Sequence, residues 1–155
     1  MPEFDPQLDL RIERAISATP EAIWRCWSEP ELLKRWFTPP PVTVEDVEIE
    51  LAPGGRFFSV MKLPDGTVMP SEGCFVLVER HRRHVFTDAL RAGFRPAHAP
   101  FFTADVRLTP TDTGTLYSVH VMHADTNARQ KHEDMGFHDG WGTTIGQLGE
   151  LARSL

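Results

Sequence analysis

Cysteines are scarce in this sequence, and long apolar runs are absent. The two cysteines, Cys26 and Cys74, lie in segments rich in apolar residues, and neither lies in a C-x-x-C motif. We therefore predict buried, reduced thiols rather than a disulfide or a nucleophile. The sequence contains no run of about 18 apolar residues, and its first ten residues lack the basic start and apolar core of a signal peptide. We expect no membrane span and a cytoplasmic protein.

Positive charge is also scarce. The formal net charge is -6, and the longest uninterrupted run of basic residues is Arg82-Arg83. A surface that binds nucleic acid needs clustered lysine and arginine to neutralise phosphates. We therefore expect no nucleic-acid partner.

The length of 155 residues suits one globular domain, and we expect a single domain over residues 1–155. The composition is ordinary for such a domain, with 41% hydrophobic and 25% charged residues. Aromatic residues stand out, because 10 Phe and 4 Trp are more than one small core usually needs.

The N-terminal part predicts a strand followed by two short helices. Residues 8–16 alternate between apolar and polar, which is typical of a half-buried strand. Thr19 followed by Pro20 predicts a helix start. Ser28 and Glu31 have the spacing of a capping box and predict a second helix, which the prolines of residues 39–41 end.

The middle of the chain, residues 42–123, predicts antiparallel strands. Its apolar residues mostly recur with period two, and short turns rich in proline and glycine interrupt them. Parallel strands would need longer connections, usually helical. We predict six strands here and a mobile loop over residues 91–100, which contain two prolines and one glycine.

Residues 132–155 combine a helical apolar stripe with five glycines. Each glycine in a helix interior costs about 0.8–1 kcal/mol relative to alanine, so another interaction must offset the loss. Two explanations stay open: close packing against neighbouring backbone, or space for a ligand. A kink is also expected at one of the first two members of this set, which comprises Gly136, Gly140, Gly142, Gly146 and Gly149.

Together these segments predict an α+β fold. A curved antiparallel sheet of six to seven strands would wrap around a long C-terminal helix, with two short helices after the first strand. The long helix is needed because such a sheet must curl or cover one face.

Four stretches carry a resemblance to a known family: "PELLKRWFTPP", "LAPGGRFFSVMKLPDG", "VFTDAL" and "HEDMGFHDGWGTTIGQLGELA". With the predicted order of elements, the chain resembles the START-like helix-grip superfamily (SRPBCC). It is most similar to the branch of the activator of the heat-shock-protein-90 ATPase and the calicheamicin-resistance protein. This resemblance implies a hydrophobic ligand cavity between the sheet and the long helix, but it does not imply a shared reaction.

A ligand cavity of this kind is mostly apolar with a few polar anchors. Alternation alone does not decide whether Phe58 and Val60 or Phe57 and Ser59 point inward. We include Phe58 and Val60 among the predicted ligand-binding residues. The predicted ligand-binding residues are Trp27, Trp36, Phe58, Val60, Phe75, Phe86, Thr87, Phe102, His120, Met135, His138, Trp141, Gly142 and Ile145.

Metal and cofactor sites are not expected. His132 and His138 lie about 240° apart on one continuous helix, so they do not share a face. His120 and His123 lie on opposite faces of a strand. Asp134 and His138 are four residues apart and can pair, and His132 and Asp139, seven apart, could also face alike. Three convergent ligands are still lacking. Motifs for covalent catalysis are also missing.

Three hypotheses for function follow. The leading one is cofactor-free binding of a hydrophobic or amphipathic small molecule. The second is a small enzyme of cyclase, aromatase or hydrolase type, in which His120 or His138 acts with Asp134 as acid and base. The third is a co-chaperone-like stress-response partner, by analogy with the heat-shock-protein-90 activator. Whether the protein forms a homodimer stays open.

Overall fold

The alternating N-terminal segment forms the first strand of a sheet. In the computed structural model, which describes residues 2–155, β1 spans Asp9–Ile16. It buries Leu10, Ile12 and Ile16 and exposes most of the residues between them, as the period-two pattern predicts. This apolar face points toward the interior of the protein.

Six further strands complete an antiparallel sheet with the order β1-β9-β8-β5-β4-β3-β2. This number of strands after the helix pair confirms the prediction. A separate hairpin of two two-residue strands, β6 and β7, overlaps the segment expected to be a loop and begins one residue before it. The strand bounds are β2 Thr43–Ile49, β3 Arg56–Lys62, β4 Val68–Glu79, β5 Arg83–Thr87, β6 Leu90–Arg91, β7 Arg95–Pro96, β8 Thr103–Thr111 and β9 Gly114–Met122.

Two short helices follow β1, namely α1 (Pro20–Ser28) and α2 (Pro30–Leu33). Thr19 caps α1 as predicted, because its hydroxyl accepts a hydrogen bond from the Ala22 amide at 3.1 Å. The predicted capping box at Ser28 is wrong. Helix α1 continues through Ser28, and α2 begins after Glu29 without a side-chain cap.

The C-terminal segment forms two helices rather than one. Asp125 caps α3 (Thr126–Asp134), and α4 spans Phe137–Arg153. Between them Gly136 adopts a left-handed conformation with φ of +88°, which a residue with a side chain rarely adopts. The break therefore falls at Gly136, one of the two glycines at which we expected a kink.

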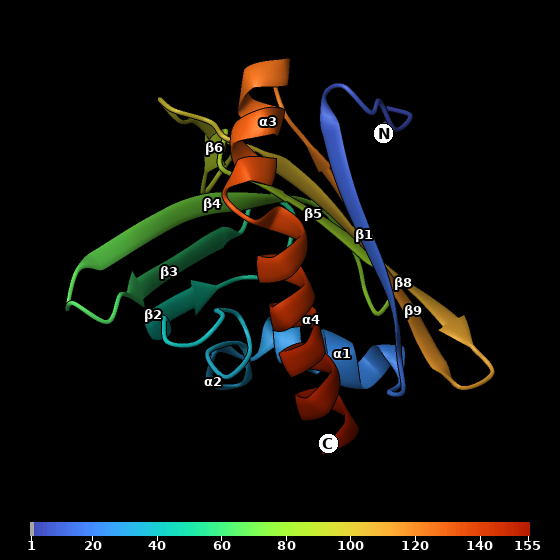
Figure 1. Ribbon diagram of the computed structural model, residues 1–155. Coiled ribbons are helices and arrows are strands. Elements are labelled where there is room, and N and C mark those ends of the chain that lie inside the picture. The colour runs from blue at the N-terminus through green and yellow to red at the C-terminus, as the bar shows by residue number, and fades with distance from the viewer. Residues whose placement is uncertain (1) are drawn as a thin grey trace.

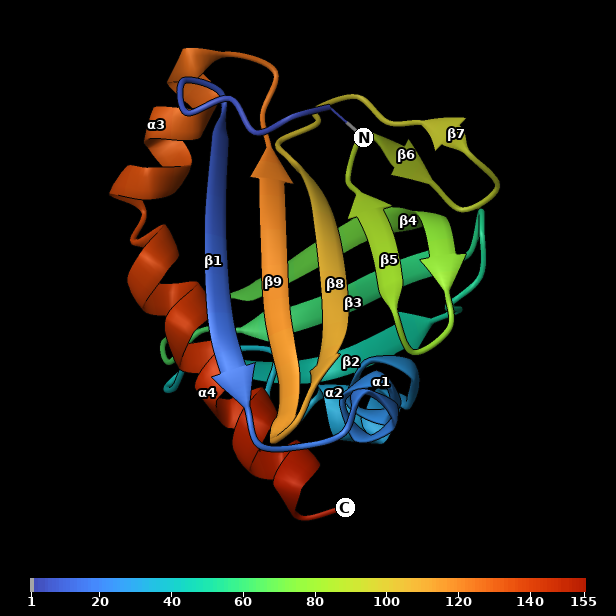
Figure 2. The same cartoon turned by 90° about the vertical axis from the view of Figure 1, so that its right-hand side faces the viewer.

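Helix α4 crosses one face of the sheet, and the sheet curves around it (Figure 1). Strands β1, β9 and β8 form one wing of the sheet, while β2, β3 and β4 run across behind them (Figure 2). Apolar side chains of the inner face of the sheet pack with α1 and α4 into the core. No helix within residues 2–155 has both the length and the apolar character needed to cross a membrane.

Both cysteines are buried and unpaired, as predicted. Burial raises the pKa of the Cys26 thiol to about 11. This thiol is therefore protonated at neutral pH and behaves as a small apolar side chain.

The glycines of α4 do not mark a close approach of backbones. A Cβ at Gly146 would meet no atom within 4 Å, and this residue is exposed. At Gly142 it would make ordinary contacts with Arg14 Nη2 at 3.6 Å and Ile12 Cδ1 at 3.9 Å. The tight backbone packing considered for this face is therefore wrong.

Candidate functional site

A cavity of about 400 Å³ lies between the sheet and α4. It is bordered by strands β3 to β5, by the segment after α2, and by the junction of α3 and α4. Most of its surface is apolar. The lining residues are Trp27, Trp36, Phe37, Pro39, Phe57, Ser59, Met61, Ser71, Glu72, Gly73, Phe86, Thr87, Asp88, Phe102, Tyr117, His132, Met135, Gly136, Phe137, Gly140, Trp141, Thr144 and Ile145.

Strand β3 supplies part of the floor of the cavity through Phe57, Ser59 and Met61. Phe58 and Val60, which we predicted to bind ligand, lie on the opposite face of this strand. There the Arg56 guanidinium stacks over the Phe58 ring at 4.2 Å from its centroid. The prediction for these two residues is corrected, because their strand has the other of the two phases that alternation permits.

Two tryptophans of the cavity already have hydrogen-bond partners within the protein. The Trp27 indole donates to the Tyr117 hydroxyl oxygen at 3.0 Å, and the Trp36 indole donates to the Cys26 carbonyl at 2.9 Å. Burial raises the pKa of Tyr117, so its phenol stays uncharged. These indoles therefore contribute mainly apolar surface to the cavity.

His132 of α3 lies where the cavity meets the junction of the two C-terminal helices. Its side chain is buried and surrounded by three other lining residues, with ring centroids at 5.1 Å for Phe102, 5.1 Å for Phe137 and 6.1 Å for Trp141. Its polar imidazole therefore lies among the larger, mostly apolar rings of phenylalanine and tryptophan.

A second histidine fixes the ring of His132. His123 Nδ1 lies 2.8 Å from the Leu8 carbonyl oxygen, and His123 Nε2 lies 2.9 Å from His132 Nδ1. Desolvation and the neighbouring His123 lower the pKa of His132 to about 4. His132 is therefore uncharged at neutral pH.

Two acidic residues are among the lining residues. Asp88 Oδ1 accepts hydrogen bonds from the amides of Phe101 at 2.7 Å and Phe102 at 3.2 Å. The Glu72 side chain points to the opposite face of the sheet, because Glu72 lies directly across from Phe58, and its Oε2 accepts a hydrogen bond from Arg56 Nε there at 3.2 Å. No lysine or arginine of the described part of the chain is among the lining residues. Nor do residues 2–155 place three His, Cys, Asp or Glu side chains where they could together hold a metal ion.

The structure separates the predicted ligand-binding residues into two groups. Those in the cavity are Trp27, Trp36, Phe86, Thr87, Phe102, Met135, Trp141 and Ile145. Those elsewhere are Phe58, Val60, Phe75, His120, His138 and Gly142. Phe75 is fully buried behind the floor, where it stacks on Phe57 with a centroid distance of 5.2 Å. Gly142 faces β1.

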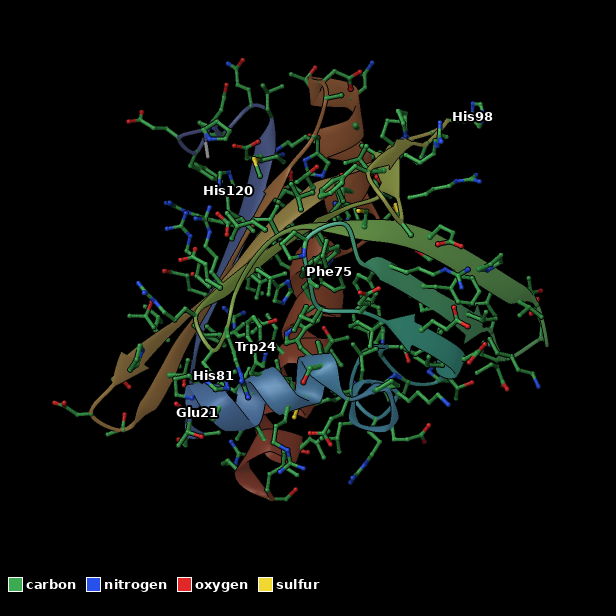
Figure 3. The ribbon with its side chains drawn as sticks, turned by 180° about the vertical axis from the view of Figure 1, so that it is seen from behind. Glu21, Trp24, Phe75, His81, His98 and His120 are labelled. Atoms are coloured by element: carbon green, nitrogen blue, oxygen red, sulfur yellow. The ribbon has the colours of Figure 1, made fainter. Side chains whose placement is uncertain are left out.

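The predicted acid–base residues do not reach the cavity. His120 lies on the face of the sheet turned away from α4, where its Nε2 lies 2.8 Å from Asp9 Oδ2 (Figure 3). His138 and Asp134 are both exposed to solvent. The pairing of His120 or His138 with Asp134 inside a cavity is therefore wrong.

Sequence reasoning missed His132 and Phe137, and it did not choose between Phe57 and Phe58. For β3, both phases were considered, but alternation could not show which one is correct. For His132, the error came from treating residues 132–155 as one helix. The left-handed Gly136 resets the helical phase, which brings a residue of α3 beside residues of α4.

A curved antiparallel sheet wrapped around a long terminal helix, with an apolar cavity between them, defines a helix-grip protein. The chain belongs to the family of activator of Hsp90 ATPase homolog 1-like proteins, whose model matches residues 17–153. A comparison with curated proteins gives no match.

Solved structures with the same fold come from several bacteria. Protein NE0264 from Nitrosomonas europaea is 44% identical, with a TM-score of 0.95 over 97% of both chains. Protein Ms6760 from Mycobacterium smegmatis is 29% identical, with a TM-score of 0.76 over 94% of this chain and 90% of its own. A protein from Arthrobacter aurescens is 25% identical, with a TM-score of 0.80 over 99% of this chain and 91% of its own.

Proposed function

We propose that this protein binds a hydrophobic or amphipathic small molecule in the cavity between the sheet and α4. The observation that carries this proposal is the apolar cavity of about 400 Å³ between the curved sheet and α4. Natural ligand pockets have volumes of roughly 300–1,000 Å³ and are mostly apolar with few polar groups. The size and the lining therefore both suit a small organic ligand.

An empty cavity of this kind is unfavourable. A water molecule occupies about 30 Å³ in the liquid, so the volume has room for on the order of ten waters. The aromatic lining offers those waters few hydrogen-bond partners. Displacing poorly bonded water with an apolar ligand gains free energy. The cavity thus favours binding by the hydrophobic effect.

A ligand has a route to this cavity. Ser71 on β4 and Met135 between α3 and α4 line the cavity and are exposed, Met135 by 66%. Solvent therefore reaches the cavity between these two elements. Met135 is a flexible, unbranched side chain that can move aside without disturbing the sheet.

The enzyme hypothesis has less support than binding. Its candidate residues lie outside the cavity, and the imidazole inside, His132, has its pKa lowered to about 4. A base that weak removes few protons from a substrate at neutral pH. The co-chaperone-like role stays a prediction that rests on the family description alone.

Titration with N-phenyl-1-naphthylamine, an uncharged aromatic probe, tests the proposal. We expect saturable binding of one probe per chain with increased fluorescence. Ser59→Leu would place an apolar side chain in the cavity, because Ser59 lies on its floor. Val60→Leu is the matched control, because the neighbouring Val60 lies on the other face of β3.

We expect Ser59→Leu to weaken probe binding and Val60→Leu to leave it unchanged, with both variants folded by circular dichroism. Absence of saturable binding to the wild-type protein would overturn the proposal. Equal binding by the wild type and Ser59→Leu would show that the probe sits elsewhere, and it would count against the cavity as the site.

A further inference from the structure

The hydrogen bonds of the histidine pair determine which nitrogens carry protons. The Leu8 carbonyl has no hydrogen to donate, so His123 Nδ1–H donates to it at 2.8 Å. An uncharged His123 then has a bare Nε2, which accepts a hydrogen bond from His132 Nδ1–H at 2.9 Å. An uncharged His132 in turn has a bare Nε2, a hydrogen-bond acceptor.

Both rings are buried, and the uncharged form of His132 is favoured. His123 is 7% exposed and His132 is 6% exposed. Within residues 2–155, no carboxylate oxygen forms an ion pair with either ring; the imidazole that has such a partner is His120. Burial without an opposite charge disfavours a protonated imidazole. The chain of hydrogen bonds from Leu8 to His132 therefore holds one tautomer.

His132 Nε2 is the polar atom of this pair that remains without a partner among the described residues. The ring lines the cavity together with Phe102, Phe137 and Trp141. Unlike the ring nitrogens of His84, this nitrogen is not among the fully buried atoms without a partner, so water can reach it. A ligand that enters the cavity displaces this water, and a donor on the ligand replaces the hydrogen bond that is lost. The cavity thus offers an imidazole acceptor held in a defined orientation.

The charges of the lining argue against an anionic ligand. Asp88 is acidic, the Glu72 carboxylate is paired with Arg56 on the other face of the sheet, and the lining residues in the described part of the chain include no lysine or arginine. A ligand carboxylate or phosphate would be desolvated there without a compensating cation, which is strongly unfavourable. A hydroxyl or N–H group has no such cost.

We propose that His132, positioned by His123, is the polar anchor of the cavity, and that the ligand is an uncharged ring compound with a hydroxyl or N–H donor. This inference rests on the proposed function, because it needs the cavity to be a binding site. His132 would touch the ligand, and His123 is a positioning residue that acts through His132.

Three probes of one ring system test the inference: 2-naphthol, 2-methoxynaphthalene and 2-naphthoate. At pH 7 the first is uncharged with a donor, the second is uncharged without one, and the third is an anion. We expect 2-naphthol to bind tightest in calorimetric titrations, and 2-naphthoate weakest. A single hydrogen bond predicts a gap of roughly 2- to 13-fold between the first two probes.

His132→Phe keeps a flat ring but removes the acceptor. It should reduce the gap between 2-naphthol and 2-methoxynaphthalene to about none, whereas His132→Gln, which has an amide oxygen, should restore part of it. His138→Phe is the matched control, since His138 is an exposed histidine outside the cavity. His123→Phe should shrink the gap less than His132→Phe, because it frees the tautomer without removing the acceptor.

Nitrogen-15 NMR of the imidazoles gives a readout that a merely structural role would not move. We expect His132 to carry its proton on Nδ1 at pH 7, and its Nε2 resonance to shift with 2-naphthol but not with 2-methoxynaphthalene. A proton on Nε2, or an equal gap in the wild type and His132→Phe, would overturn the inference alone. Failure of all three probes to bind would overturn the proposed function and the inference with it.

Discussion

Two buried histidines in aromatic surroundings show how this fold makes both a solid core and a cavity. His84 on β5 is fully buried between Trp24, Trp27 and Phe75, and its ring centroid lies 4.3 Å from that of Trp27. Figure 3, the view from behind, labels Trp24 and Phe75. His132 has similar neighbours, yet it borders open volume.

The helices that cover the two regions explain the difference. Over His84, α1 presents large side chains such as Trp24 and Trp27, which fill the space against the sheet. Near His132, the helical segment presents Gly136 and Gly140, and a Cβ at either position would meet no atom within 4 Å. Aromatic content alone therefore does not explain the cavity. The space is open because Gly136 and Gly140 have no side chains to fill it.

The hydrogen bonds differ in the same way. Neither ring nitrogen of His84 has a hydrogen-bond partner, although both are buried. His132 has His123 at one nitrogen and the cavity beside its ring. In the closed core, the imidazole of His84 has no hydrogen bonds, and the fold tolerates the resulting loss of free energy. Beside the cavity, the imidazole of His132 has one hydrogen bond within the protein and can form a second one with a ligand.

The largest expected effect is loss of stability in acid. Desolvation lowers the pKa of His84 to about 3, and desolvation with His123 lowers that of His132 to about 4, from an ordinary 6.5. Below pH 6.5 the unfolded chain binds protons that the folded protein does not, so the free energy of unfolding falls as the pH falls toward these values. Each histidine contributes at most about 1.4 kcal/mol per pH unit.

Urea denaturation between pH 7 and 5 measures this slope, since most carboxyl groups titrate lower. His84→Leu should reduce this dependence of the free energy of unfolding on pH by the contribution of His84. A slope equal in the wild type and His84→Leu would mean that the folded protein accommodates a charged His84, and the comparison between the two regions would lose its basis.

The second prediction concerns His84→Leu at pH 7. Leucine has a similar volume and no polar atoms, so it removes two buried, unpartnered nitrogens. We expect the free energy of unfolding to rise by about 1–2 kcal/mol. His132→Leu should lower it by about 1 kcal/mol, because it leaves His123 Nε2 without its partner. A marked loss of stability in His84→Leu would indicate that its ring has a partner after all, such as a buried water.

The third prediction concerns a large side chain introduced on α4, which would fill the cavity as the large side chains of α1 fill the space over His84. Gly140 lines the cavity, and a Cβ there would meet only open space, so Gly140→Leu should fill part of the volume at little cost in stability. We expect the affinity for N-phenyl-1-naphthylamine to fall by at least about tenfold, or 1.4 kcal/mol. Gly146→Leu is the control on the exposed side of α4 and should bind like the wild type. Unchanged binding in Gly140→Leu would separate the probe site from this cavity.

Local rules predicted the elements well and the inward faces less well. Thr19 caps its helix as expected, because a cap depends on a few adjacent residues. Alternation on β3 could not distinguish Phe57 from Phe58, because a one-residue shift reverses every side chain of a strand. The sequence placed Phe86 and Trp141 among the lining residues because large aromatic side chains rarely lie far from the interior.

The histidine pair was beyond sequence reasoning for a different reason. Its formation needs three segments that are distant in the chain: Leu8 before β1, His123 after β9 and His132 on α3. The helical break at Gly136, which orients α3, depends on a left-handed backbone that a helical periodicity does not reveal. No local pattern contains this arrangement.

The smallest expected effect tests the outer face of α4. Gly146 is exposed and without neighbours within 4 Å, so Gly146→Ala adds a methyl group to open space and removes the entropic cost of glycine in a helix. The free energy of unfolding should rise by about 0.8–1 kcal/mol, with no change in probe binding. On the side of α4 that faces β1, Gly142→Ala should also be tolerated, because its methyl would meet Arg14 Nη2 at 3.6 Å, an ordinary contact. A lower melting temperature for Gly146→Ala would mean that another surface covers this face of α4 in solution. The glycines there would then serve that contact, in contrast to Gly136 and Gly140, which keep the cavity open.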